Sequence, residues 1–216
     1  MPPAPLPQQL DELSELLGQM CTRVAEALNN ATAALIEDRE RLAHLVVVGD
    51  ADIDALRVRV EEVASDALLF HSPVAGDLRR VVSAIRCAGD IERMGDLALH
   101  VAQVVERKRR LPAEVRGHFV EMGEVAVQLA LKAAEVARTR NVVLAVELDG
   151  DDDAMDRLHE HMMGVLMDPG WPHGVPAAVD VTLLARYYER FADHAVVVAR
   201  ETVYAVTGEE PDALPI

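Results

Sequence analysis

Four of the acidic pairs in this 216-residue chain, each spaced four residues apart, occur in two matched sets. Residues i and i+4 lie on one face of a helix, so each pair would present two carboxylates together. Two such pairs on neighbouring helices form an all-oxygen ligand set, which suits hard cations such as Fe, Mn, Mg or Ca. The sequence therefore predicts two metal sites. Their candidate ligands are Asp50, Asp54, Glu92 and Asp96 in the first half, and Asp152, Asp156, Glu189 and Asp193 in the second.

These pairs belong to an internal repeat, which is the most informative property of the chain. The stretch GDIERMGDLALHVA, residues 89–102, is repeated as RYYERFADHAVVVA, residues 186–199. The D-x-x-x-D of residues 50–54 is likewise repeated at residues 152–156. Single acidic pairs are expected by chance in a chain with 37 acidic residues, so the interpretation rests on their repetition in a matched, otherwise apolar context.

A structural role is the alternative for the same carboxylates, which would then pair with Arg93 and Arg190 or with solvent. Catalysis has less support, because the chain has no HExxH, GxSxG, Walker A or GxGxxG motif. A ferritin-like di-iron centre needs E-x-x-H on two helices, and the nearest approach, Asp156-x-x-His159, occurs once. We therefore predict no catalytic residues and no enzyme. A carboxylate-bridged metalloenzyme or metal store remains the alternative function.

Charge and composition restrict the partners and the compartment. The formal net charge of −16 disfavours nucleic acid and anionic lipid as ligands. Cys21 and Cys87 form no C-x-x-C motif, as expected in a reducing cytosol. The N-terminus lacks the basic and apolar regions of a signal peptide, and the longest apolar runs are too short to span a membrane. We expect a cytoplasmic protein that reaches the membrane only through its partners.

The spacing of apolar residues, three and four apart, favours helices, as does the aromatic content of only 3%. Gly49-Asp50 and Gly150-Asp151 indicate helix stops followed by acidic N-caps. The predicted fold is all-α, with six helices in two tandem, pseudo-symmetric, antiparallel three-helix bundles, residues 8–108 and 112–207. In each bundle, D-x-x-x-D starts the second helix and E-R-x-x-D lies inside the third. The predicted helices span residues 8–47, 51–71, 75–108, 112–147, 152–167 and 175–207.

At these residues the sequence resembles the PhoU family of bacterial phosphate-uptake regulators. That family has an ERIGD-type motif on the third helix of each of two three-helix bundles, and the counterparts here are residues 92–96 and 189–193. SPVAGDLRRVVSAIR, residues 72–86, is similar to the SPVA-x-DLR stretch of the family. DDAMDRLHEHMMGVL and WPHGV resemble its actinobacterial branch, sometimes called PhoY. Phe191-Ala192 departs from the usual Ile-Gly, at positions that carry no carboxylate.

The resemblance implies a cytoplasmic accessory regulator without catalysis of its own. Such proteins couple the ATPase of the phosphate-specific ABC transporter to a sensor histidine kinase, so that signalling is off when phosphate is plentiful. Some members carry iron or zinc clusters on their acidic motifs, and members are often homodimers. We therefore expect Fe, Zn, Mn or Mg at the eight carboxylates, both of these partners, and a homodimer.

Overall fold

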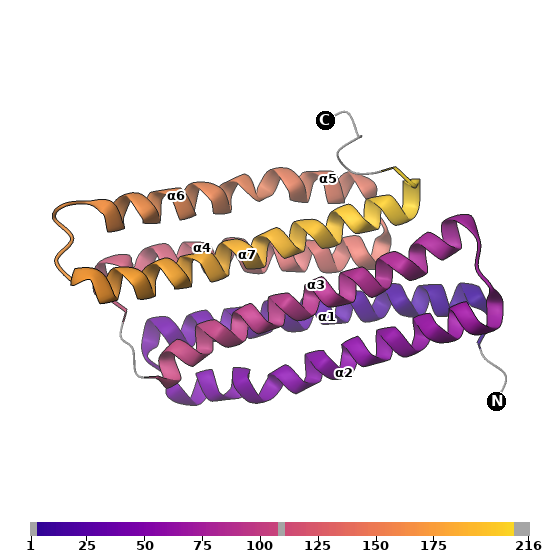
Figure 1. Ribbon diagram of the computed structural model, residues 1–216, viewed down its shortest axis with the longest axis horizontal. Helices are drawn as coiled ribbons and strands as arrows, with labels where there is room; N and C mark the ends of the chain where they lie inside the picture. Colours follow the sequence, from indigo (N-terminus) through magenta and orange to yellow (C-terminus); the bar gives the residue numbers. More distant parts are fainter. Residues whose placement is uncertain (1–3, 108–110, 210–216) are drawn as a thin grey trace.

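The computed structural model describes residues 4–107 and 111–209, which form seven helices and no strand (Figure 1). Residue 108, the predicted end of the third helix, lies outside the described residues. α5 and α6 are separated only by Asp152, whose backbone is still helical (φ −64°, ψ −27°), so they follow one path and form one rod. The helices are α1 (Leu6–Glu37), α2 (Glu40–His71), α3 (Ala75–Glu106), α4 (Ala113–Thr139), α5 (Val142–Asp151), α6 (Asp153–Met167) and α7 (Gly174–Thr207).

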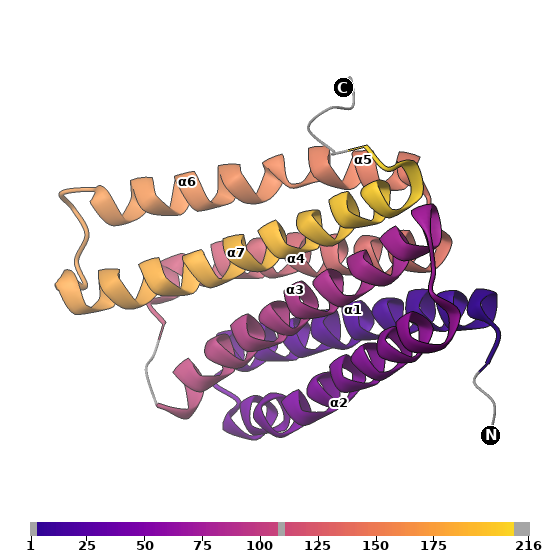
Figure 2. The ribbon, with the colours of Figure 1, turned by 45° about the vertical axis from the view of Figure 1, so that its right-hand side comes forward.

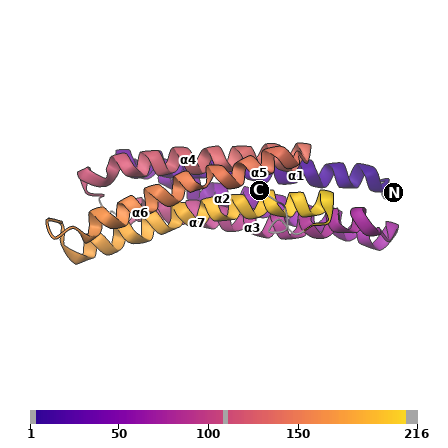
Figure 3. The same cartoon turned by 90° about the horizontal axis from the view of Figure 1, so that it is seen from above.

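The helices lie side by side along a long and thin body (Figures 1 and 3). α1 and α3 of the first half pack against α4 and α7 of the second half, and these four helices form the centre. α2 covers one edge of the body and the α5–α6 rod covers the other (Figure 2). The predicted all-α fold of two three-helix bundles is thus confirmed, with the buried apolar side chains of both halves in one core. The unit boundaries at 8–108 and 112–207 stay a prediction.

In the first half, the predicted break at residues 49–50 is wrong. α1 ends at Glu37 and α2 begins at Glu40, so Gly49 lies inside a helix. The chain turns instead at Asp38, which adopts a left-handed backbone (φ 54°). Aspartate tolerates this conformation better than most residues other than glycine. The first acidic pair therefore lies within the second helix and not at its start.

In the second half, the predicted break at residues 150–151 is misplaced as well. α4 ends at Thr139, because Arg140 takes a left-handed backbone (φ 57°). Asn141 then starts α5, and its side chain accepts hydrogen bonds from two backbone N–H groups of the first turn. A helix of 10 residues consequently precedes the second acidic pair, as the first turns of α2 precede the first pair.

A buried polar contact joins the two halves near the centre. The Tyr188 hydroxyl on α7 is fully buried and lies 2.8 Å from the Thr32 hydroxyl on α1. Thr32 in turn packs against Gly123 on α4, where a Cβ would come within 2.8 Å of Thr32 Cγ2. Burial raises the pKa of Tyr188, so the phenol is neutral and needs this hydrogen-bond partner. α1, α4 and α7 are thus held together at one point.

Small side chains build most of the core. Alanine, valine and leucine predominate among the buried positions, which lets the helix axes approach closely.

None of the helices in the two described ranges has a stretch both long enough and apolar enough for a bilayer to accommodate.

Candidate metal centres

The first acidic cluster lies where α2 packs against α3. Asp50 on α2 rests against Gly95 on α3, where an added Cβ would lie 3.5 Å from Asp50 Oδ1 and 3.2 Å from Ile53 Cδ1. Glu92 and Asp96 flank this glycine in the E-R-M-G-D motif. The missing side chain at residue 95 therefore lets α2 bring its carboxylate close to the acidic pair of α3.

The four carboxylates of this cluster interact electrostatically. Burial raises the pKa of Asp50, and the negative charges of Asp54, Asp96 and Glu92 raise it further. The structure thus brings together the four residues that the sequence predicted for the first half. Their mutual repulsion disfavours the state in which all four are ionised.

Two arginines offset part of the charge of the first cluster. Arg93 Nη1 lies 3.2 Å from Asp96 Oδ2, as the structural alternative had predicted. Arg57 Nη1 lies 3.0 Å from Glu92 Oε1, a contact that the sequence analysis missed. Its position on α2, three residues after Asp54, was the available signal, because residues i and i+3 share a helix face.

The second acidic cluster joins the α5–α6 junction to α7. Asp152 is the junction residue and is partly buried. Burial raises its pKa to about 7, together with the negative charges of Asp156, Asp193, Asp149 and Glu189. This carboxyl group therefore titrates near neutral pH, far above the ordinary range of an aspartate.

Two oxygen atoms of the second cluster are buried without a partner. The side chain of Glu189 is only 13% exposed, and its Oε1 pairs with Arg186 Nη1. Burial and the charge of Asp193 raise the pKa of Glu189, whereas Arg186 and His159 lower it. Glu189 Oε2 and Asp152 Oδ1 have no hydrogen-bond partner. Unpaired buried acceptors are costly, so these oxygens fit a cation bound between the α5–α6 junction and α7.

The outcome for the predicted ligands is the same in both halves. Each set of four carboxylates is brought together, although among the described residues no three acidic, His or Cys side chains already converge on a metal-binding position. A bound cation therefore requires the carboxylates to rotate toward one another. Arg190, expected to pair with this motif, forms no ion pair within residues 4–107 and 111–209, and Arg186, one turn earlier, takes that role. The assignment of the eight residues as metal ligands stays a prediction.

Both clusters consist mainly of groups that only accept hydrogen bonds or bind cations. Such oxygens can hold a cation and tie two helices together. No histidine base flanks them at matched positions in both halves. The arrangement is therefore suited to binding a cation and to stabilising a helix pair.

The fold and the matched acidic pairs place this chain in the class of proteins with a duplicated three-helix domain. The model of the PhoU domain matches residues 17–105 and 119–202. The chain belongs to the PhoU family, as its resemblance to that family indicated.

Relatives of high similarity cover nearly the whole chain. The phosphate-specific transport system accessory protein PhoU homolog 2 of Mycobacterium tuberculosis is 51% identical over 207 residues, which are 94% of this chain and 97% of that protein. PhoU homolog 1 of Mycobacterium leprae is 49% identical over 208 residues, 95% of this chain and 94% of that protein. These relatives confirm the actinobacterial branch. They are described as accessory proteins and not as enzymes, in agreement with the prediction that the chain is no enzyme.

Solved structures share the fold. PhoU from Pseudomonas aeruginosa matches with a TM-score of 0.83 at 24% identity, covering 95% of this chain and 100% of that chain. The phosphate transport system regulatory protein PhoU from Streptococcus pneumoniae matches with a TM-score of 0.79 at 22% identity, covering 98% and 100%. At these identities the likeness concerns the helical architecture alone.

Proposed function

We propose that this protein is a cytoplasmic accessory regulator of phosphate uptake, which represses phosphate-starvation signalling by binding other proteins. The observation that carries the proposal is the duplicated PhoU domain, together with identities of 51% and 49% to accessory proteins of phosphate-specific transport systems. The proposed partners are the ATPase of the phosphate ABC transporter and a sensor histidine kinase. The protein would couple the two, so that the kinase is silent when phosphate is plentiful.

The shape and charge of the molecule support a binding role. A long helical body (Figure 1) with a net charge of −16 suits docking to basic patches on protein partners. The same charge disfavours direct binding to anionic lipid or nucleic acid. We propose a homodimer as the working assembly, which light scattering of the purified protein tests directly.

Metal binding by Fe, Zn, Mn or Mg is the second part of the proposal. Asp152, Asp156, Glu189 and Asp193 would hold a cation in the second half, where two oxygens are buried without partners. The four carboxylates of α2 and α3 would hold one in the first half. A bound cation supplies positive charge between like-charged side chains. The carboxylates themselves orient the helices that carry them. Without a bound cation, protons and arginines compensate part of their charge.

The regulatory proposal is tested with a clean deletion in the source strain, grown in high phosphate. Transcripts of phosphate-scavenging genes are measured, and phosphate uptake is followed in parallel. We expect the genes to be expressed despite the phosphate, and a plasmid copy of the gene to silence them again. Scavenging genes that stay silent in the deletion strain, with unchanged uptake, contradict the proposal.

A metal store is the second candidate function, and the unpartnered oxygens of the second cluster are the observation that favours it. Elemental analysis of protein purified without chelators separates the alternatives. Two carboxylate clusters predict about two cation sites per chain, whereas a store takes up many more.

A further inference from the structure

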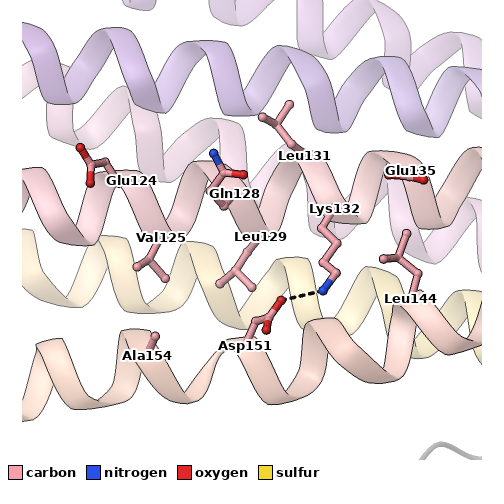
Figure 4. A pocket seen from close by; sticks show the side chains of 10 residues that line it. All are labelled: Glu124, Val125, Gln128, Leu129, Leu131, Lys132, Glu135, Leu144, Asp151 and Ala154. Carbon is pink, nitrogen blue, oxygen red and sulfur yellow. Dashed lines mark hydrogen bonds and ion pairs between the residues drawn. The ribbon is translucent and has the colours of Figure 1, made fainter.

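A groove runs between α4 and the α5–α6 rod in the second half (Figure 4). Its volume is about 920 Å³, and apolar side chains form much of its lining, with Val125 and Leu129 from α4, Leu144 from α5 and Ala154 from α6. The α5–α6 rod buries two side chains from each of its helices, and its partly buried Leu144 and Ala154 line this space.

The rim of the groove is acidic. Glu124 and Glu135 on α4 are exposed, and neither forms an ion pair within the described ranges. Lys132 also lines the groove, but Asp151 and Glu147 neutralise it, with Nζ 2.7 Å from Asp151 Oδ2 and 3.3 Å from Glu147 Oε2. Negative charge on the rim is therefore left uncompensated.

The two unpaired glutamates lie on the same side of α4, where one partner helix could contact both. They lie 11 residues apart in the sequence, which is about three turns and roughly 16 Å along α4, so both are on one side of that helix. Figure 4 shows Glu124 toward one end of the groove and Glu135 toward the other. Leu131, which also lines the groove, is 41% exposed and offers an uncovered apolar contact.

We infer that this groove is a docking site for a basic amphipathic helix of a partner protein. The apolar face of that helix covers the partly buried Val125 and Leu144, and its Lys or Arg side chains pair with Glu124 and Glu135. Charge complementarity selects this occupant. An acidic helix would bring like charges together at Glu124 and Glu135. The inference rests on the proposed function in one respect, namely that the protein acts by binding partners.

The probe for the test is a fluorescein-labelled amphipathic peptide of Leu and Lys, about 18 residues or five helical turns long. Fluorescence anisotropy measures its binding to the full chain. A peptide with Glu in place of every Lys and a scrambled peptide of the same composition are the controls. We expect the basic amphipathic peptide to bind and both control peptides to bind at least roughly tenfold more weakly.

Matched charge variants locate the binding site. Glu124→Lys/Glu135→Lys should weaken peptide binding roughly tenfold or more, because two attractive rim contacts become repulsive. Asp52→Lys/Asp66→Lys changes the net charge equally on the exposed face of α2 and should alter binding less than about twofold. Circular dichroism checks the fold. If the groove variant does not fold, Ala154→Arg, which fills the groove from α6, must produce the same loss.

Three results overturn the inference. These are equal losses in the two double variants, equal binding of the scrambled peptide, and a groove variant that changes self-association of the chain without affecting the peptide. A reporter strain separates this inference from the proposed function. Loss of peptide binding with intact phosphate repression overturns the regulatory use of the groove and leaves the proposed function standing. A silent reporter in the deletion strain, with peptide binding confined to the groove, rejects the proposed function and supports the groove.

Discussion

The two acidic clusters have the same motif but differ in how their charge is compensated. In the first cluster, Arg57 and Arg93 pair with the two carboxylates of α3. In the second, Arg186 reaches one oxygen of Glu189, while the other oxygen and one of Asp152 are buried without partners. The second cluster therefore holds more uncompensated negative charge, and it is the better candidate for a tightly bound cation.

A single position in the repeat accounts for much of this difference. The residue three positions after D-x-x-x-D is Arg57 in the first half and His159 in the second. Arginine is a permanent cation that does not ligate metals, whereas a histidine side chain can ligate one. His159 lies close enough to Glu189 to lower its pKa. The repeat thus combines one cluster whose charge two arginines partly compensate and one that retains more uncompensated negative charge.

The largest expected effect comes from removing ligands. Asp152→Asn/Glu189→Gln should reduce the affinity of the second cluster for Mn or Fe(II) by more than roughly a hundredfold. Loss of a residue that only hydrogen-bonds to a metal ligand already costs roughly 10- to 100-fold, and loss of the ligands themselves should cost more. Asp50→Asn/Glu92→Gln should abolish the weaker site of the first half. Isothermal titration and elemental analysis measure both. If the first pair of substitutions leaves the tighter site intact, the two clusters have been ranked wrongly.

The next largest effect is expected from exchanging the matched residues Arg57 and His159 between the two halves. Arg57→His should raise metal affinity of the first cluster by up to about tenfold, because an ion pair of roughly 1 kcal/mol no longer competes with the metal. His159→Arg should lower affinity of the second cluster by a similar factor. Arg59→Ala is the control on α2, since Arg59 pairs with Glu12 and Glu62 instead. Equal responses to Arg57→His and Arg59→Ala would show that general charge, and not this position, sets the affinity.

Much of the site could be predicted from the sequence, because i, i+4 spacing fixes a helix face whatever the helix ends are. The helix ends themselves could not. Asp38 and Arg140 take the left-handed conformations that end α1 and α4, while Gly49 lies inside α2. Glycine permits a turn but does not require one, and packing of the flanking helices decides where the chain turns. The pairing of Arg186 with Glu189 depended on rotamers, which spacing alone does not determine.

An effect of intermediate size is the pH dependence of stability that we expect from the second cluster in the metal-free protein. The pKa of Asp152 is about 7 in the folded protein and near 3.8 in the unfolded chain, so the folded state binds this proton more tightly. Its contribution to stability is complete below pH 3.8 and is lost as the pH rises through about 7. In chelator, Asp152→Asn should therefore flatten the decline in Tm between pH 5 and 7.5. It should raise Tm at the upper end by roughly 2–4 °C for each kcal/mol regained.

Two further arms make the pH experiment decisive. Asp66→Asn, at an exposed position of α2, should keep the slope of the unmodified protein. Saturating Mn should also remove the decline, because a cation replaces the proton among the carboxylates. An Asp152→Asn protein with the full original slope would locate the titrating group elsewhere.

The smallest effect concerns Gly95 and Ala192, the matched residues beneath the two clusters. Ala192→Gly should destabilise the chain by about 1–2 kcal/mol, because it loses helix propensity and a fully buried methyl group. Gly95→Ala gains about 1 kcal/mol of propensity, but its Cβ would lie 3.2 Å from Ile53 Cδ1. The neighbouring side chain must give way by a few tenths of an ångström, so the net change should stay within about 1 kcal/mol. Urea denaturation measures both variants. A Gly95→Ala protein destabilised by more than about 2 kcal/mol would mean that α2 cannot yield, and that close contact at this glycine is what sets the geometry of the first cluster.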